Sequence, residues 1–509
     1  MTHPQNVLLL VVDQMRADCL HGALAAHVDL PNLRGFAKDS VDFRKHYSAA
    51  NPCGPSRASL LTGQFAMNHR AVRNTAPLAH DTPSLPMEMR KAGYLPLLFG
   101  YTDTAQDPRI YPKGDPALTS YHTHMLGFQE IVEMRYGQSK PWTAHLHKQG
   151  YSFDGPTELY TPVAQGGNVP RLNDPALYAA KHSDTAYLTN RFLKHMTSEE
   201  SGPWFAHLTY IRPHPPLVAP APYNTLYTPA DMPLPVTQGT MEQERALHPF
   251  FAPMQDHLPP QKMVNGFENV PRSDDTHRTL RAIYLGLAAE LDKHVGRILN
   301  YLKDSGQYDD TMIIITADHG EMLGDRHAWG KHSVFDAAYH IPLMIRIPGS
   351  APAVIHAPTQ STDITPTILN WLGRDVPNAV DGRSLLGFLK GAPPKDWRDY
   401  SYSELDFGQP GSQTIYQKTL GITASESNLC ILRGPRYTLV EFACDLPPML
   451  FDFHGKGEAQ DVASHPDHQS ALYDMTRRML RHRMRAAGQN LSLTTITSDG
   501  PVTEKRSVD

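Results

Sequence analysis

The sequence is poor in cysteine, lacks long apolar runs and has no marked excess of either charge. Four of its 509 residues are cysteines, at positions 19, 53, 430 and 444. No two of them form a C-x-x-C pair, so the spacing gives no sign of a disulfide framework. The formal net charge is −5, which offers no general attraction for nucleic acid. Recognition of an anion must therefore come from a few local residues.

The chain also has no apolar stretch of about 20 residues, the length that a membrane-spanning helix needs. The apolar run from Asn6 to Val12 lacks the basic flank and the small-residue cleavage site of a signal peptide. We therefore expect a cytoplasmic protein with no membrane partner. Because the run is short, rich in β-formers and followed by Asp13, it is typical of a buried strand in a parallel sheet that carries a polar group at its carboxyl end.

Apolar strand patterns alternate with helical patterns along the chain, which predicts an α/β fold with a large doubly wound mixed sheet flanked by helices. The clearest helix is predicted over 278–303, where apolar residues recur every three or four positions. Shorter helices are predicted over 84–92 and 365–372. The expected strands are 6–12, 95–99, 204–211, 312–316 and 342–347.

The character of the sequence changes twice. Between Gly137 and Pro260 it is rich in Pro, His and Gly, which favours long ordered loops. After Trp397, β-like segments precede a helix predicted over 468–487, which indicates a smaller C-terminal α+β domain. Those segments are 399–405, 429–432 and 437–442. The expected divisions are 1–397, 398–489 and a polar tail or oligomerisation arm at 490–509.

The most informative local pattern is C-x-P-S-R, which begins at Cys53. A lone cysteine is usually a small buried apolar residue. With average residue usage, however, Pro-Ser-Arg two positions after one of four cysteines has odds on the order of one in a thousand. Pro55 suits the start of a helix, and the residues after it can continue one. The N–H groups of that helix N-terminus would favour an anion beside Cys53.

A second pattern is an apolar strand that runs into Asp318 and His319, as the first strand runs into Asp13 and Gln14. The carboxyl ends of parallel strands meet at one edge of a sheet, so these four side chains would lie together. Oxygen ligands with one imidazole suit a divalent cation. Each side chain taken alone could equally cap a strand, but their occurrence together with Cys53 favours a metal site.

These patterns together resemble the type I sulfatases of the alkaline phosphatase superfamily, in particular the arylsulfatases and phosphonate monoester hydrolases. The resemblance spans nearly the whole chain and implies an alkaline phosphatase-like fold. Its cysteine pattern is highly specific, whereas the other matching segments are individually weak. Those segments are 13–16, 53–63, 68–70, 212–216, 317–324, 331, 362–364 and 381–384.

The resemblance implies that a formylglycine-generating enzyme oxidises Cys53 to formylglycine, whose hydrated aldehyde supplies a nucleophilic hydroxyl. It also implies one divalent metal ion (Ca²⁺, Mn²⁺ or Mg²⁺) and a small anionic ester as substrate. His214 would assist the leaving-group oxygen or the second hydroxyl of the hydrated aldehyde, or would only order its proline-rich loop. The implied catalytic residues are Cys53, Arg57, His214 and Lys331, the implied substrate-binding residues are Asn74, Tyr101 and Asp103, and the implied metal ligands are Asp13, Gln14, Asp318, His319 and Cys53.

The chain departs from the family pattern at two places. Many arylsulfatases carry Gly-Lys-x-His where this chain has Gly-Tyr-Thr-Asp at 100–103, and Gln14 replaces a commonly acidic ligand. Fewer cations near the substrate reduce the advantage of a doubly charged ester. We therefore expect a hydrolase of sulfate esters that also accepts phosphonate monoesters and phosphodiesters. The alternative is a phosphonate monoester hydrolase or phosphodiesterase with sulfatase side activity. Asp103 could contact the substrate or point outward.

Two other classes of protein share this scaffold. A metal-dependent phosphomutase or phosphatase would use Ser or Thr as nucleophile and usually a second metal, whereas a noncatalytic binding protein would have lost turnover. Cys53 and the single-metal ligand set argue against the first class, and the joint presence of all the site residues argues against the second. The resemblance further implies a homo-oligomer, either a dimer or a tetramer.

Overall fold

The computed structural model describes residues 5–137, 139–167, 169–198, 202–488 and 494–503. The chain forms two compact units that interleave in sequence. Unit 1 comprises Met1–Arg44, Tyr94–Tyr101 and Phe128–Val354, and unit 2 comprises Lys45–Gly93, Thr102–Gly127 and Ile355–Asp509. The divisions at 397 and 489 stay predictions.

An eight-stranded mixed sheet forms the centre of unit 1, which confirms the predicted α/β class. Six of the seven residues in the first strand are buried, which explains its continuous apolar run. The first strand pairs in parallel with its two neighbours, whereas β9 runs antiparallel to β8. In spatial order the strands are β10 (Ala353–Ile355), β2 (Val41–Phe43), β9 (Leu343–Arg346), β8 (Thr311–Ala317), β1 (Asn6–Val12), β7 (Phe205–Tyr210), β5 (Pro96–Gly100) and β6 (Gln129–Glu133).

The strand register brings several carboxyl ends to one edge of this sheet. Val12 of β1 pairs with Ala317 of β8 and with Tyr210 of β7. The residues that follow these three strands therefore emerge side by side, as the sequence predicts for Asp13 and Asp318. The end of β5 reaches the same edge, because Phe99 pairs with Leu208 of β7.

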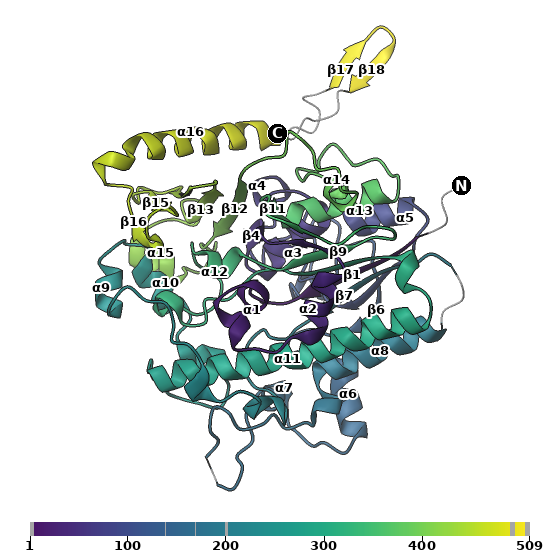
Figure 1. Ribbon diagram of the computed structural model, residues 1–509, viewed down its shortest axis with the longest axis vertical. Helices are drawn as coiled ribbons and strands as arrows, with labels where there is room; N and C mark the ends of the chain where they lie inside the picture. The colour runs from purple at the N-terminus through teal and green to yellow at the C-terminus, as the bar shows by residue number, and fades with distance from the viewer. Residues whose placement is uncertain (1–4, 138, 168, 199–201, 489–493, 504–509) are drawn as a thin grey trace. The chain divides into compact units, whose positions relative to one another are not determined.

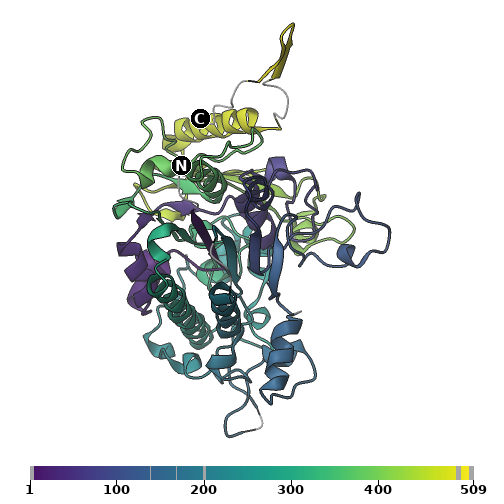
Figure 2. The ribbon, with the colours of Figure 1, turned by 90° about the vertical axis from the view of Figure 1, so that its right-hand side faces the viewer.

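Long helices pack against one another in unit 1. The longest, α11 (Asp274–Asp304), begins four residues before its predicted start, at the N-cap Ser273, whose side chain accepts a hydrogen bond from the Thr276 amide. It lies beside α8 (Asp184–Ser198), as Figure 1 and Figure 2 both show, and also contacts α2 (Pro31–Lys38). Within the described residues, no helix combines the length and the apolarity needed to cross a membrane.

The prediction of loops over 137–260 is wrong in part. This region contains α6 (Lys140–Lys148), α7 (Pro156–Leu159), α8 and two further short helices, α9 (Met241–Arg245) and α10 (Phe251–His257). In α8 the buried Leu188, Phe192 and Met196 recur every four residues, as a helix face requires. The flanking prolines and the interspersed threonines and histidines obscure this period in the sequence.

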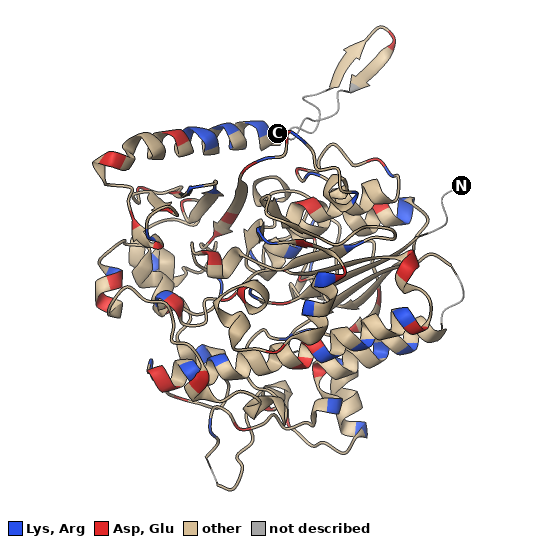
Figure 3. Ribbon diagram, viewed as in Figure 1, with Lys and Arg blue, Asp and Glu red and all other residues tan. Residues whose placement is uncertain are grey.

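Unit 2 contains a six-stranded sheet with α16 (Gln469–Ala486) packed against β14. The predicted C-terminal strands and helix are thus confirmed, with boundaries that differ by at most two residues. Met475 and Met479 of α16 are buried in the core, while Figure 3 shows a run of basic residues along the same helix. The order of strands is β16 (Gly457–Asp461), β15 (Met449–Asp452), β14 (Tyr437–Phe442), β13 (Asn428–Arg433), β12 (Ser401–Asp406) and β4 (Ala50–Asn51).

Unit 2 also contains the helix that carries the cysteine pattern. This helix, α3 (Cys53–Thr62), begins at Cys53, two residues before Pro55, and is followed by Gly63 in a left-handed conformation with φ 67°.

Part of the predicted tail forms a hairpin, and its other residues lie outside the described ranges. The remaining elements are α1 (Asp18–His21), α4 (Ala66–His69), α5 (Leu85–Lys91), α12 (Asp336–Tyr339), α13 (Ile364–Trp371), α14 (Leu386–Leu389), α15 (Ile415–Leu420), β3 (His46–Tyr47), β11 (Thr359–Gln360), β17 (Thr494–Thr497) and β18 (Gly500–Thr503).

Candidate active site

Two carboxylates and one imidazole meet at the edge of the sheet in unit 1. Ligand atoms of Asp13, Asp318 and His319 all lie within 4.8 Å of one another. Their exposed fractions are 2%, 0% and 0%. Two buried carboxylates at this separation repel each other unless a cation lies between them. The donor set therefore fits a divalent cation with oxygen and imidazole ligands.

His319 presents one defined nitrogen to these carboxylates. Its Nδ1 donates to the carbonyl oxygen of Gly320 at 3.0 Å, so Nε2 lies toward the acids. Nε2 is 3.7 Å from Oδ1 of Asp13 and 3.7 Å from Oδ2 of Asp318. Burial, with a further contribution from Lys331, holds the pKa of His319 well below its ordinary value. A neutral imidazole with a lone pair on Nε2 is the form that binds a metal.

The side chain of Gln14 is held in a single orientation. Its Oε1 accepts a hydrogen bond from Nζ of Lys331 at 2.7 Å, and its Nε2 donates to Oε2 of Glu321. Its backbone N–H donates to Oδ1 of Asp318 at 3.0 Å, from a left-handed conformation with φ 68°. The amide oxygen of Gln14 is therefore the group turned toward Lys331.

Glu321 fixes this orientation, although the sequence analysis assigned it no role. Its Oε1 accepts from the backbone amides of Gly330 at 2.6 Å and Leu323 at 3.1 Å, which leaves Oε2 for Gln14. Burial raises the pKa of Glu321. The signal available in the sequence was its position two residues after His319, in the run Asp-His-Gly-Glu.

Lys331 also contacts His214. The Nζ of Lys331 lies 3.2 Å from Nε2 of His214, whose Nδ1 is hydrogen-bonded to the carbonyl oxygen of Pro215. Because a carbonyl only accepts, the proton of the neutral ring is on Nδ1, and Nε2 accepts from Lys331. Burial and the charge of Lys331 lower the pKa of His214 to about 4. The predicted assistance to a leaving group requires a proton on Nε2 and stays a prediction.

Tyr101 follows β5 directly and donates a hydrogen bond to Oδ2 of Asp13. The chain reaches this position through Gly100 at φ 115°, where a β-carbon would lie 2.5 Å from the carbonyl oxygen of Thr209. Only glycine fits that close approach. The contact places Tyr101 as a partner of a predicted metal ligand, and its predicted contact with substrate stays a prediction.

The other predicted site residues belong to unit 2. Cys53 is the first residue of α3 and is 4% exposed, and Arg57 lies one turn later at 2%. The Gly54 amide donates to Oδ1 of Asn74 at 2.9 Å. A β-carbon on Gly54 would lie 3.1 Å from the carbonyl oxygen of Asp103. Unit 2 thus gathers Cys53, Asn74 and Asp103 around the N-terminal turn of α3.

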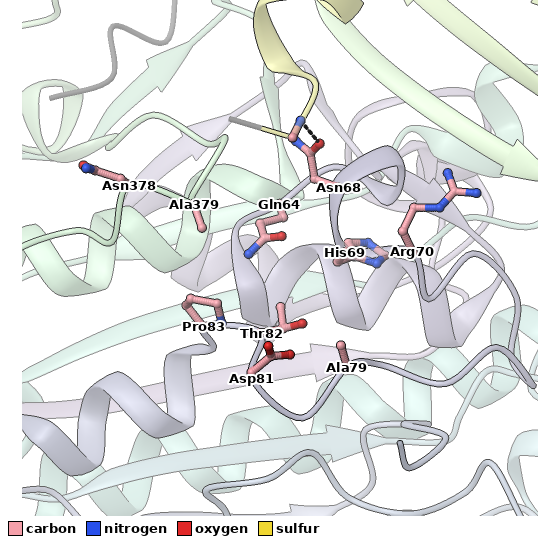
Figure 4. A pocket seen from close by; sticks show the side chains of 11 residues that line it. Gln64, Asn68, His69, Arg70, Ala79, Asp81, Thr82, Pro83, Asn378 and Ala379 are labelled. Atoms are coloured by element: carbon pink, nitrogen blue, oxygen red, sulfur yellow. Dashed lines mark hydrogen bonds between the residues drawn. The ribbon is translucent and has the colours of Figure 1, made fainter. Parts of the chain in front are cut away.

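A separate cavity of about 260 Å³ in unit 2 contains none of these predicted residues. Figure 4 shows that Gln64, Asp81 and Thr82 lie around it, with Asn68 at its upper side. The Oδ1 of Asn68 accepts from the Gly488 amide at 2.8 Å, which fixes the chain just after α16. The cavity is therefore distinct from the site residues around Cys53.

Comparison with known proteins gives matches over almost the full length. A family model described as Sulfatase matches residues 5–374, and one described as N-sulphoglucosamine sulphohydrolase, C-terminal, matches residues 324–485. A multifunctional alkaline phosphatase superfamily protein from Trinickia caryophylli is 36% identical over 96% of this chain and 97% of its own. An arylsulfatase from Clostridium perfringens is 25% identical over 81% of this chain and 84% of its own.

Solved structures show the same relationship. The phosphonate monoester hydrolase from Silicibacter pomeroyi is 57% identical, with a TM-score of 0.98 over 99% of this chain and 100% of that chain. The phosphonate monoester hydrolase of Agrobacterium radiobacter is 36% identical, with a TM-score of 0.93 over 98% and 99%. The chain therefore belongs to the sulfatase family, among homologues from the alkaline phosphatase superfamily, and is a hydrolase that acts on sulfate or phosphonate esters.

Proposed function

We propose that the protein is a metal- and formylglycine-dependent hydrolase of singly charged esters, with phosphonate monoesters and phosphodiesters as its preferred substrates and sulfate esters as further substrates. This ranking takes the second of the two alternatives raised by the sequence, because the 57% and 36% identical structures are both phosphonate monoester hydrolases. Preference for sulfate esters is the second candidate, and it is favoured by the Sulfatase family match.

The charge balance of the unit 1 residues is the observation that carries the proposal. Asp13 and Asp318 together would offset the charge of one divalent ion. Gln14 and Tyr101 are neutral, and burial raises the pKa of Glu321. With Glu321 protonated, the ammonium of Lys331 is the remaining charge that meets the substrate. In a buried site the net charge of the surroundings must match the charge of the ligand. One ammonium matches a singly charged ester better than a doubly charged phosphate monoester.

In this proposal Asp13, Gln14, Asp318 and His319 hold one divalent ion, either Ca²⁺, Mn²⁺ or Mg²⁺. When bound, such an ion polarises an ester oxygen and acidifies a hydroxyl group beside it. Glu321 would fix the amide of Gln14 so that its oxygen, and not its nitrogen, is available to the ion. Lys331 donates hydrogen bonds to the sulfuryl or phosphonyl oxygens, and His214 orients Lys331.

Cys53 provides the nucleophile after its oxidation to formylglycine by a formylglycine-generating enzyme. We propose that residue 53 completes the metal centre, a placement supported by the almost complete overlap with the two solved hydrolases. Arg57 steadies the modified side chain. Asn74, which is already fixed by the Gly54 amide, would contact the substrate oxygens.

The test is a panel of p-nitrophenyl esters that carry the same leaving group. We expect kcat/KM to be highest for p-nitrophenyl phenylphosphonate, lower for bis-p-nitrophenyl phosphate and p-nitrophenyl sulfate, and lowest for the dianionic p-nitrophenyl phosphate. The Cys53→Ala variant serves as the blank and should lose turnover of all four. A clear preference for the dianionic phosphate, or full activity in Cys53→Ala, would refute the proposal.

A further inference from the structure

His122, which the sequence analysis did not single out, forms a histidine–carboxylate pair with Asp103 in unit 2. The Nδ1 of His122 is 2.9 Å from Oδ1 of Asp103, and the two side chains are 16% and 5% exposed. A carboxylate accepts, so Nδ1 carries the proton of this bond, and Nε2 is the nitrogen able to meet a ligand. Among the residues described in the structure, none hydrogen-bonds to Nε2 of His122.

The pair lies next to the residue that follows Cys53. A β-carbon built on Gly54 would lie 3.1 Å from the carbonyl oxygen of Asp103 and 3.2 Å from Oδ1 of Asn74. The backbone at Asp103 is therefore in contact with the first turn of α3, whose first residue is Cys53. A β-carbon at position 54 would be in unusually tight contact with these atoms and would require them to shift slightly.

The backbone of Asp103 has an unusual conformation. Its φ of 47° lies in the left-handed region, which residues with a side chain seldom adopt. Such conformations persist where the surrounding structure enforces them, and they recur at functional sites. Here the conformation turns the carboxylate toward His122 while the carbonyl stays against Gly54.

Hydrogen bonds tie the segments on either side of the pair together. The Thr104 amide donates to the Thr123 carbonyl at 3.1 Å. The side-chain amide of Gln106 donates to Oγ1 of Thr123 at 2.7 Å and to the His124 carbonyl at 2.9 Å. The Met125 amide donates to Oγ1 of Thr102 at 2.8 Å. The imidazole is therefore held in a defined position, as a residue that orients a substrate must be.

We propose that His122 contacts the substrate in the same centre as Cys53, with Nε2 hydrogen-bonded to the sulfuryl or phosphonyl group and with Asp103 as its positioning residue. The inference rests on the function proposed above. A histidine ring that carries both protons would donate from Nδ1 to Asp103 and from Nε2 to an anionic oxygen. No bond to the substrate is made or broken by His122.

Binding of phenylphosphonate, the product of p-nitrophenyl phenylphosphonate hydrolysis, tests this contact without turnover. In the metal-loaded Cys53→Ala protein, the affinity for phenylphosphonate is measured by isothermal titration calorimetry. The added substitution His122→Asn keeps a donor in the place of Nδ1, facing Asp103, but has no atom in the place of Nε2. We expect it to weaken binding by about tenfold, the loss typical of one charge-assisted hydrogen bond.

A matched control comes from His80, whose Nδ1 is 2.9 Å from Oδ2 of Asp107 in the same unit. His80→Asn should leave phenylphosphonate binding unchanged. Asp103→Asn should weaken it in the same direction as His122→Asn, and His122→Gln, which restores a group near Nε2, should recover part of the affinity. The thermal unfolding midpoint of each variant shows that the fold is retained.

The inference is overturned if His122→Asn binds phenylphosphonate as tightly as its parent, or if His80→Asn weakens binding equally. The experiments distinguish a failure of this inference from a failure of the proposed function. If only the inference is wrong, the enzyme with formylglycine at position 53 hydrolyses the esters and His122→Asn leaves kcat/KM intact. If the function is wrong, the unsubstituted enzyme clearly prefers the dianionic p-nitrophenyl phosphate, or Cys53→Ala keeps full activity.

Discussion

Glu321 orients Gln14, a proposed metal ligand, through one hydrogen bond, while two backbone amides donate to its other oxygen. Loss of such a supporting partner typically weakens metal binding by 10- to 100-fold, or about 1–3 kcal/mol. We therefore expect Glu321→Ala to lower the affinity for Mn²⁺ by at least about tenfold, as measured by competition with a fluorescent chelator. Glu321→Gln keeps an acceptor for the two amides but turns an NH2 group toward the NH2 of Gln14, so it should also lower the affinity. Unchanged affinity in Glu321→Ala would contradict the role given to this residue.

The raised pKa of Glu290, in α11, should make the free energy of unfolding depend on pH. Burial, with a smaller contribution from Asp184, raises its pKa from 4.5 to about 8, although Ser183, Arg212 and Lys293 act in the opposite direction. The folded state therefore binds this proton more tightly than the unfolded state. The resulting stability is complete below pH 4.5 and is lost as the pH rises toward 8.

The substitution Glu290→Gln isolates this effect, because the amide keeps the shape and cannot titrate. Relative to the variant, the original protein should lose on the order of 3 kcal/mol between pH 5 and pH 8. Urea unfolding of both proteins at each pH measures the difference. A difference that does not vary with pH would show that Glu290 does not titrate in this range.

At the scale of residues, the sequence predicted that the side chains of Asp13 and Asp318 would lie together, but it did not predict the residues that support the site. Asp13 and Asp318 could be predicted because each follows an apolar strand, and strand ends are visible as a pattern. Glu321 and His122 could not be assigned roles in this way. Their contacts depend on the conformation of the loops, and loop conformation leaves no periodic pattern in the sequence.

At the scale of elements, α16 is fixed to the sheet of unit 2 through Arg483. Its NH1 donates to the Tyr402 hydroxyl of β12 at 2.6 Å and to Sγ of Cys430 in β13 at 2.8 Å. Since the Tyr402 side chain is fully buried, Arg483→Met should lower the free energy of unfolding by about 1 kcal/mol. Arg481→Met, at an exposed position of the same helix, should have no effect. Equal unfolding midpoints for the two variants would contradict this.

Helices and strands in which apolar residues recur at a regular spacing could be predicted from the sequence. Elements without such a pattern could not. The helix α11 has a continuous apolar face, and β14 was predicted with its observed bounds, Tyr437–Phe442. The strand β4 has two residues, too few to form a pattern, yet it pairs with β12 through Ala50 and Glu404. A pairing across more than 300 residues of chain has no local signal in the sequence.

At the scale of the whole molecule, association of subunits remains the expectation raised by the family resemblance. Multi-angle light scattering of the full chain should give the mass of a dimer or a tetramer. The hairpin of β17 and β18 exposes Ile496 and Val502 by 79% and 59%, so removal of residues 490–509 should shift the mass toward the monomer. A monomeric full chain would contradict this expectation.

The central claim is that Cys53, once converted to formylglycine, is the nucleophile of an ester hydrolase. The most direct measurement is peptide mass spectrometry of residue 53 in preparations with different degrees of conversion, combined with the rate of p-nitrophenyl phenylphosphonate hydrolysis by each. The account predicts that the rate rises in proportion to the aldehyde fraction and vanishes where Cys53 is entirely a thiol. A rate that does not depend on that fraction would contradict it.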